Sequence, residues 1–210
     1  MFTGIIQDVG RIEAIERDED QAHMLFESSL DMSGWALGDS VAVDGCCLTI
    51  TRFEGSHRFA ATLSQETLSL TILGQAREGL RVNLEPAMRL GDAMGGHMVS
   101  GHVDGMGEVV DIVPMGEHTR MRFRLSPELA RYVVSKGSVA VNGVSLTVNR
   151  VEQYDFEVNL IPHTLQHTNL DDLQASDRVN IETDMLGRYV ERYVERLLEF
   201  HSGPDAKMEK

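Results

Sequence analysis

Three shortages in the sequence each exclude a class of protein. Its 210 residues include two cysteines, which are adjacent at positions 46 and 47. Neighbouring residues of a strand point to opposite faces, so a Cys46–Cys47 disulfide is strained, and a reducing cytoplasm is the simplest interpretation. No apolar run approaches the roughly 20 residues of a membrane span. The N-terminus, MFTGIIQDVGRIEA, has neither the basic nor the apolar region of a secretory signal.

Positive charge and nucleotide-binding motifs are also scarce. The net charge of −14 repels phosphate backbones, which excludes nucleic acid as an expected partner. The sequence has no Walker loop, no GxGxxG after a strand and no GxSxG, so a nucleotide cofactor bound through those motifs is unsupported. What remains is an ordinary globular composition, 42% hydrophobic and 25% charged, long enough for one large domain or two small ones.

The chain contains an internal duplication. VAVDGCCLTITR (41–52) and VAVNGVSLTVNR (139–150) are identical at seven of twelve positions. MFTGIIQDVGRIEAI (1–15) aligns with MVSGHVDGMGEVVDI (98–112), ETL (66–68) with HTL (163–165), and RVNLE (81–85) with RVNIE (178–182), all offset by 97. Four matches in the same order predict two domains, 1–96 and 97–185, joined through the glycine-rich GDAMGGH at 91–97.

Each copy is predicted to be a small antiparallel barrel. Asp-Gly and Asn-Gly between apolar, β-branched runs are typical of two-residue hairpins. RFAATLS, RVNLEPAM, HTRMRFRLS, DFEVNLIP and RVNIETD continue the strand pattern, giving about six strands per copy. Ser126-Pro127-Glu128 predicts a helix start, with serine as the cap and proline in the first turn.

The C-terminal segment predicts a helix over 186–201. Leu186, Val190, Tyr193, Leu197 and Phe200 recur at spacings of 4, 3, 4 and 3, which is a helical apolar stripe. A helix this short is marginal alone, so the stripe needs a partner surface, either its own barrel or another copy of the chain. The last residues, 202–210, are expected to be a disordered tail.

Strand periodicity separates a core face from a polar face after each hairpin. Cys46, Leu48 and Ile50, like Val144, Leu146 and Val148, are expected in the core. Cys47, Thr49 and Thr51 share the other face with the equivalents Ser145, Thr147 and Asn149, and this face either lines a ligand cleft or meets solvent. His97 and His102, five residues apart, would point to opposite faces of a strand, and no metal site is predicted there.

Three further polar residues have interpretations from the pattern alone. His102 replaces Ile5 of the first copy, which indicates either a functional asymmetry between the copies or a hydrogen-bonded structural histidine. Asp184 precedes the tail helix and fits its N-cap. Lys136 fits a solvated surface lysine.

The motifs MFTGII, DGCCLT, GGHMVSGHVDG and NGVSLTV, followed by a C-terminal helix, resemble the riboflavin synthase α-chain family over residues 1 to about 200. The resemblance implies an all-β fold of two six-stranded antiparallel Greek-key barrels, each binding a lumazine, plus a helix that mediates a homotrimer. It implies a cofactor-independent dismutation of two 6,7-dimethyl-8-ribityllumazine molecules to riboflavin and 5-amino-6-(D-ribitylamino)uracil, at sites shared by the first barrel of one subunit and the second barrel of another.

The resemblance also implies site residues. Those tied to activity are Phe2, Ser40, Cys47, His102, Ser145, Thr147 and Asp184. The first pocket is expected to contain Gly4, Ile5, Ile6, Cys47, Leu48, Thr49, Thr62, Leu63, Ser64, Gln65, Glu66 and Thr67. The second is expected to contain Gly101, His102, Val103, Lys136, Ser145, Leu146, Thr147, Ile161, Pro162, His163, Thr164, Leu165 and Gln166.

The reaction implied requires a proton to leave the C7 methyl of one lumazine and a nucleophile or water to add at C7 of the other. The Cys47 thiol can assist at one site, His102 can move protons near neutral pH, and Ser145 and Thr147 can donate hydrogen bonds to developing charge. One departure from the duplication is His163, which replaces the acid Glu66. The alternative function is a non-catalytic lumazine- or flavin-binding protein of the antenna type, which shares the fold.

Overall fold

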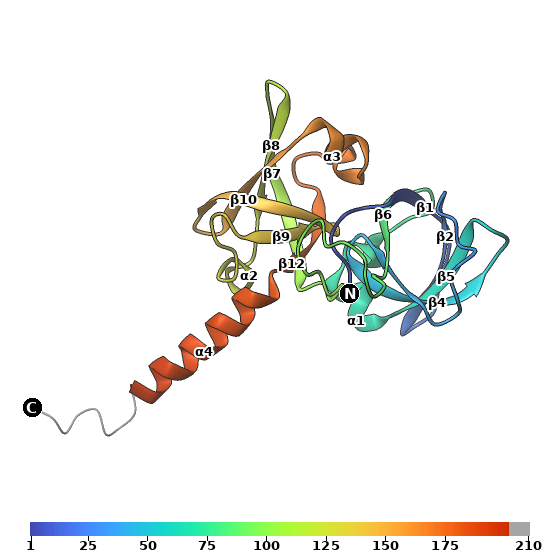
Figure 1. Cartoon of the computed structure of the whole chain (residues 1–210), viewed down its shortest axis with the longest axis horizontal. Coiled ribbons are helices and arrows are strands. Elements are labelled where there is room, and N and C mark those ends of the chain that lie inside the picture. Colours follow the sequence, from blue (N-terminus) through green and yellow to red (C-terminus); the bar gives the residue numbers. More distant parts are fainter. Residues whose placement is uncertain (202–210) are drawn as a thin grey trace, which may run out of the picture.

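The computed structural model describes residues 1–201 of the chain and has two closed β-barrels side by side (Figure 1). The first barrel consists of β1 (Asp8–Arg17), β2 (Gln21–Glu27), β3 (Ser40–Val43), β4 (Cys46–Phe53), β5 (Arg58–Ser64) and β6 (Arg81–Pro86). The second consists of β7 (Gly105–Met115), β8 (His118–Arg124), β9 (Ser138–Val141), β10 (Val144–Glu152), β11 (Asp155–Leu160) and β12 (Arg178–Thr183). The predicted pair of six-stranded antiparallel barrels is confirmed.

The two barrels have the same strand order. Around the first barrel the neighbours run β1-β2-β5-β4-β3-β6, and adding six to each number gives the second. In the first barrel β1–β2, β3–β4 and β4–β5 pair as consecutive strands, while the β2–β5 and β3–β6 pairs join strands distant in the chain, as in a Greek key. A closed sheet leaves no strand wholly unpaired, so most backbone hydrogen bonds of each barrel lie within its own half of the chain.

Short helices interrupt the strands at equivalent places. After β5 come α1 (Gln65–Leu70) and the 3-10 helix η1 (Ile72–Gln75), and after β11 come α3 (Pro162–Gln166) and η2 (Asn169–Asp172). Helix α2 (Pro127–Ala130) begins as predicted, with the Ser126 side chain accepting the Leu129 N–H and Pro127 in the first turn.

Each barrel has its own apolar core, and the duplication extends to it. Phe26 and Phe59 stack with ring centroids 5.1 Å apart in the first barrel, and Phe123 and Phe156 stack at 5.2 Å in the second. A third, small cluster of Phe2, Ala42, Val99 and Ala140 lies between the barrels. Each repeat therefore has a core of its own, and the small third cluster lies between the two.

The two predicted hairpin turns meet each other at the contact between the barrels. Asp44 and Gly45 have φ of 46° and 78°, and Asn142 and Gly143 have 45° and 79°, as a two-residue turn with two positive φ angles requires. A Cβ on Gly45 would lie 2.7 Å from the Gly143 nitrogen, so the two turns touch through backbone. Asn83 Nδ2 donates to the Asn142 carbonyl, and Asn180 Nδ2 donates to the Asp44 carbonyl, both at 2.9 Å.

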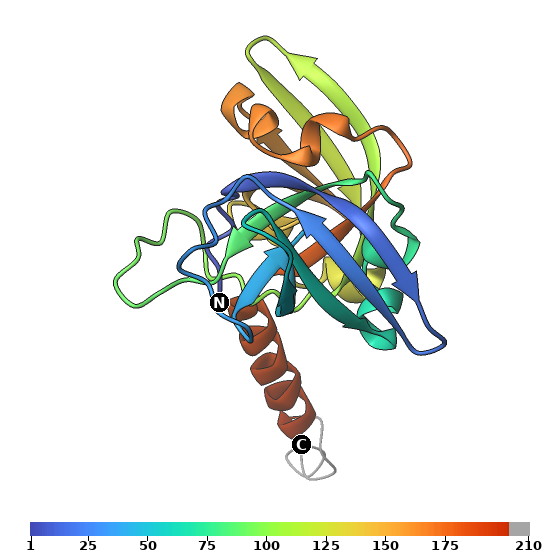
Figure 2. The ribbon, with the colours of Figure 1, turned by 90° about the vertical axis from the view of Figure 1, so that its right-hand side faces the viewer.

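Helix α4 (Met185–His201) projects away from both barrels (Figures 1 and 2). Its polar side is tied to the second barrel, where Arg131 pairs with Glu191 and Glu195, and Arg188 pairs with Asp104. The stripe residues Val190 and Phe200 are 64% and 90% exposed.

The predicted helix is thus confirmed, but most of its apolar stripe does not pack on its own barrel. The expected disorder of 202–210 falls outside the described residues. None of the helices that the structure describes is long and apolar enough to cross a membrane.

Candidate active site

The two faces predicted for the strands after the hairpins are confirmed. Cys46, Leu48 and Ile50 are buried in the first barrel, whereas Cys47 is half-buried and Thr49 is exposed. Burial raises the pKa of the Cys46 thiol to about 12, so this thiol stays protonated and unreactive at neutral pH.

The second copy repeats this arrangement. Val144, Leu146 and Val148 are buried, Ser145 is half-buried and Thr147 is exposed. Cys47 and Ser145 therefore occupy the same place, at the start of a strand and outside its barrel core.

Two short stretches, residues 2–6 and 99–103, pass from one barrel to the other, and we call them the crossing segments. The Gly4 carbonyl accepts the Ser145 N–H at 2.8 Å, and the Gly101 carbonyl accepts the Cys47 N–H at 2.8 Å. Ile6 packs against the core of the second barrel and Val103 against the core of the first.

This exchange of contacts differs from the grouping of segments in the expected pockets. Gly4–Ile6 lie with Ser145 of the second copy, and Gly101–Val103 lie with Cys47 of the first, so each segment contacts the strand of the other copy and not that of its own. The grouping implied by the resemblance kept each segment with its own repeat, and nothing in a linear pattern shows that the chain crosses between barrels.

Glycine is required where the crossing segments touch the candidate residues. Gly4 and Gly101 have φ of 74° and 82°, which side chains rarely adopt. A Cβ on Gly4 would lie 2.6 Å from the Ser145 Cβ, and a Cβ on Gly101 would lie 2.6 Å from the Cys47 Cβ. The peptide backbone itself therefore forms the wall beside each of these two side chains.

Phe2 holds the two crossing segments together. Its N–H donates to the Val99 carbonyl at 2.8 Å and its carbonyl accepts the Val99 N–H at 3.1 Å. Both side chains are buried, and the Phe2 ring would contact a Cβ on Gly101 at 2.8 Å. Phe2 therefore contributes to the candidate site through the backbone that it anchors.

His97 is a neighbour of Ser145 that the sequence interpretation missed. Its Nδ1 lies 2.7 Å from the Ser145 Oγ, and its Nε2 is buried without a hydrogen-bond partner. Burial lowers the pKa of His97, which favours the neutral ring at neutral pH.

Residues 97–102 form a loop with a single bridge at Val99, so the strand geometry used to compare His97 with His102 does not apply here. His97 lies just outside the matched segments, which begin at Met98 in the second copy, so the comparison of the two copies did not single it out.

Four other expected residues lie in different settings. His102 is exposed, and its N–H donates to the Ser100 hydroxyl at 3.2 Å. Ser40 is half-buried at the start of β3, opposite Thr49. Asp184 caps α4 by accepting the Leu186 N–H at 3.0 Å, as the N-cap interpretation predicted. Lys136 is exposed, with φ of 67°.

The remaining expected segments lie where β5 passes into α1 and where β11 passes into α3. Thr62–Thr67 include Ser64, whose hydroxyl caps α1 by accepting the Thr67 N–H. Ile161–Gln166 begin α3 without a side-chain cap. Glu66 and His163 are both exposed, and the His163 ring stacks on His167 with centroids 4.1 Å apart. The substitution of the acid therefore changes an exposed side chain and not a buried one.

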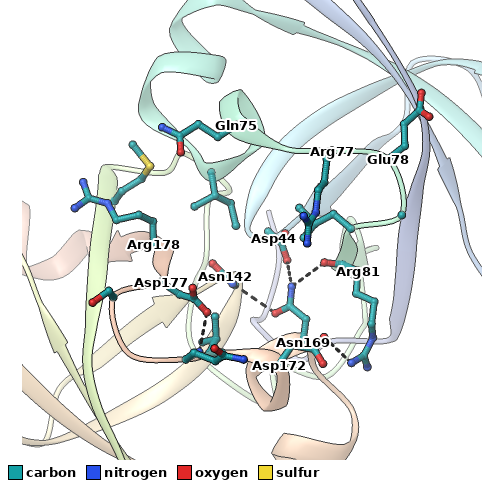
Figure 3. A pocket seen from close by; sticks show the side chains of 17 residues that line it. Asp44, Gln75, Arg77, Glu78, Arg81, Asn142, Asn169, Asp172, Asp177 and Arg178 are labelled. Carbon is teal, nitrogen blue, oxygen red and sulfur yellow. Dashed lines mark hydrogen bonds and ion pairs between the residues drawn. The ribbon is translucent and has the colours of Figure 1, made fainter.

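The large cavity of the molecule lies elsewhere. About 1070 Å³ opens between the barrels beside the touching turns; Arg81 and Asp172 form an ion pair at 2.6 Å in its lining, and Arg77 and Arg178 lie on opposite sides of it (Figure 3). Its lining includes none of the expected site residues. Within residues 1–201, no three histidine, cysteine or acidic side chains gather in a group that could hold a metal ion.

Comparison with known proteins identifies both the repeats and the whole chain. Residues 3–87 and 100–184 each match the lumazine binding domain family. The riboflavin synthase of Actinobacillus pleuropneumoniae is 42% identical over 194 residues, covering 92% of this chain and 90% of that protein. The riboflavin synthase of Bacillus subtilis (strain 168) is 37% identical over 196 residues, covering 93% and 91%.

Solved structures agree on the fold. LumP complexed with riboflavin superposes with a TM-score of 0.80 at 24% identity, covering 88% of this chain and 100% of that one. LumP complexed with 6,7-dimethyl-8-(1'-D-ribityl) lumazine gives 0.78 at 23% identity, covering 87% and 99%. At these identities the likeness concerns the fold alone. The synthases, by contrast, match at high identity along almost the entire sequence, and the chain belongs to the riboflavin synthase family.

Proposed function

We propose that this chain catalyses the dismutation of two 6,7-dimethyl-8-ribityllumazine molecules, moving a four-carbon unit from one to the other. The products are riboflavin and 5-amino-6-(D-ribitylamino)uracil. The observation that carries the proposal is the pair of barrels with one strand order, each presenting a small polar side chain, Cys47 or Ser145, beside a glycine of a crossing segment. A reaction between two copies of one substrate needs two equivalent binding places, and holding both substrates together supplies much of the rate enhancement.

The proposed roles follow from chemistry and accessibility. His102 is exposed and suits proton transfer near neutral pH, while Ser145 and Thr147 offer hydroxyl donors on one face of β10. Cys47 offers a half-buried thiol on the equivalent face of β4. Asp184 lies at the start of α4 and Ser40 at the start of β3, at the margins of these faces.

Substrate binding is proposed for two sets of segments, and each crossing segment is grouped with the barrel that it contacts. One set joins Gly4–Ile6 to Ser145–Thr147 and Ile161–Gln166, and the other joins Gly101–Val103 to Cys47–Thr49 and Thr62–Thr67. Lys136, exposed at the turn before β9, is proposed as a further ligand contact. The hydrogen bonds of Gly4 to Ser145 and of Gly101 to Cys47 support this division.

Assembly and location are proposed with the function. Residues 1–96 and 97–185 are proposed as the two lumazine-binding barrels, with 186–201 as the helix of a homotrimer. Each active site would then join the first barrel of one subunit to the second barrel of another. The exposed stripe of α4 supports association, and the unpaired cysteines fit a reducing cytoplasm.

Catalysis is preferred to simple binding on the basis of the relatives. The synthases at 37–43% identity are enzymes, whereas the LumP chains at 23–24% share the fold. Both polar faces also keep hydroxyl or thiol groups, as two working binding places require.

The test is to mix the purified, EDTA-treated chain with 6,7-dimethyl-8-ribityllumazine alone. Riboflavin absorbance should rise while two lumazines disappear for each riboflavin formed. A chain that stays inactive until a metal, flavin or nicotinamide is added contradicts the cofactor-independent reaction. A chain that binds the lumazine tightly and never converts it supports the antenna-type alternative.

A further inference from the structure

Two buried glutamates hold the crossing segments in place with the same three hydrogen bonds. Glu85 Oε1 accepts the Thr3 N–H at 2.6 Å and the Thr3 hydroxyl at 2.7 Å, and its Oε2 accepts the Gly4 N–H at 2.9 Å. Glu182 repeats this with the Ser100 N–H at 2.6 Å, the Ser100 hydroxyl at 2.8 Å and the Gly101 N–H at 2.9 Å. Each glutamate is 4% exposed.

The geometry requires a carboxylate. Both oxygens of each glutamate face donors, so an amide in its place would point an NH₂ group at a backbone N–H. Burial of a carboxylate is costly, and three donated hydrogen bonds, shorter than or near the usual N–H···O distance, offset that cost. A buried acid retained in both copies at this cost indicates a role beyond filling the core.

The far side of each held segment contacts a candidate reactive residue of the other barrel. Glu85 belongs to β6 of the first barrel, and the Gly4 that it holds accepts the Ser145 N–H of the second barrel. Glu182 belongs to β12 of the second barrel, and its Gly101 accepts the Cys47 N–H of the first. One glycine of the crossing segment therefore links each carboxylate to the backbone N–H of a candidate residue, Ser145 or Cys47, in the opposite barrel.

The N–H groups of Cys47 and Ser145 point to the side of each strand where its own barrel provides no partner strand. Pairing between β4 and β5 begins at Ile50, three residues beyond Cys47, and pairing between β10 and β11 begins at Val148, three residues beyond Ser145. The crossing segment replaces the missing strand at that position. In the second copy the Ser100 hydroxyl, which donates to Glu182, also accepts the His102 N–H at 3.2 Å.

We propose that Glu85 and Glu182 are positioning residues for the active site, acting crosswise: Glu85 fixes Ser145 of the second barrel, and Glu182 fixes Cys47 of the first barrel together with the backbone of His102. The assignment of Cys47, Ser145 and His102 to catalysis rests on the proposed function. The crosswise coupling itself rests on hydrogen bonds and can be measured without activity.

The test compares Glu85→Gln with Glu182→Gln in the full chain, and the duplication makes each variant the matched control for the other. The native protein is treated briefly with iodoacetamide, and alkylation of Cys47 is followed by tandem mass spectrometry, with the buried Cys46 as internal reference. Glu182→Gln should speed Cys47 alkylation by at least about threefold, because the Gly101 backbone that covers it is released. Glu85→Gln should leave the rate at the wild-type value.

Equal acceleration in both variants, or none in either, overturns the proposal. If either glutamine variant fails to fold, Ser100→Ala and Thr3→Val remove only the hydroxyl donor. The same one-sided effect on Cys47, smaller in size, is then expected from Ser100→Ala alone, and its absence overturns the proposal.

Activity gives a second readout. If the dismutation occurs, both glutamine variants should lower kcat about tenfold or more while melting within a few degrees of wild type, since small displacements of reacting groups cost large factors. Wild-type turnover in both variants overturns the positioning role. An inactive wild-type chain that still shows the one-sided alkylation refutes the proposed reaction and leaves the crosswise coupling supported.

Discussion

At the scale of single residues, one step along β4 separates two thiols with different expected roles. Cys46 lies in the barrel core with a raised pKa, and Cys47 lies half-buried beside Gly101. Cys47→Ser should slow turnover about tenfold or more, while Cys46→Ala should lower the free energy of unfolding by about 1 kcal/mol or more. Steady-state kinetics and thermal melts of both variants decide this. A rate controlled by Cys46, with Cys47 affecting only stability, contradicts the assignment.

Asp44 is a second residue whose setting makes a prediction. It is fully buried, its Oδ1 accepts hydrogen bonds from Asn83 and Asn169, and its Oδ2 has no partner. Burial raises the pKa of Asp44 to about 7, from an ordinary 3.8. Above pH 4 the unfolded chain releases this proton while the folded chain retains it, so stability falls as pH rises from about 4 to about 7.

Asp44→Asn should remove this pH dependence, because an amide does not titrate. The equivalent turn already carries Asn142, so asparagine fits this backbone. The variant and the wild type should melt alike near pH 4, and the variant should be more stable by about a few kcal/mol at pH 8. Melting curves from pH 4 to 8 measure the difference. A constant offset between the two proteins across that range means that the Asp44 carboxyl titrates normally in the fold.

At the scale of elements, α4 is attached on one side only. Arg131 and Arg188 tie its polar side to the second barrel, while Val190, Tyr193 and Phe200 are exposed on the apolar stripe. An apolar stripe on a projecting helix is stabilised by burial against matching stripes of other copies. Truncation before Leu186 should therefore convert a trimer into monomers, as measured by sedimentation or light scattering.

A point variant separates the stripe from the rest of the helix. Tyr193→Glu should weaken assembly strongly, whereas Arg192→Glu, one residue earlier on the polar side, should leave it intact. If the truncated chain and Tyr193→Glu both remain trimeric, the barrels and not the helix hold the assembly.

At the scale of the whole molecule, the crossing segments determine how a shared active site must be tested. One chain carries Cys47→Ala and Thr67→Ala, and the other carries Ser145→Ala and Thr147→Ala, so each damages one pocket. His102 is left intact in both, because the crossing segment places it with the Cys47 pocket. Each chain alone should be nearly inactive.

Refolding the two chains together should restore a measurable fraction of wild-type activity, since some sites would join the intact first barrel of one chain to the intact second barrel of the other. A site contained within one chain always retains its damaged half, so mixing would restore nothing. No recovery in mixtures shown by native mass spectrometry to contain both chains refutes a site between subunits.

The sequence by itself determined the local structure, because each local pattern carries its own physical cause. The Asp-Gly and Asn-Gly turns, the alternation through Cys46–Thr51, the Ser126 cap and the stripe of α4 depend on neighbours within a few residues. The offset of 97 then fixed two domains with a common strand order.

Only the tertiary structure decided which segments meet. Gly4 contacts Ser145, Gly101 contacts Cys47, and His97 contacts Ser145, although these pairs are separated by 48 to 141 positions in the chain. Glu85 and Glu182 appear in the sequence only as the last letters of RVNLE and RVNIE, and nothing local marks them as buried. Contacts of this kind are decided by how two closed barrels pack together, which depends on the shapes of complete surfaces and not on any periodicity along the chain.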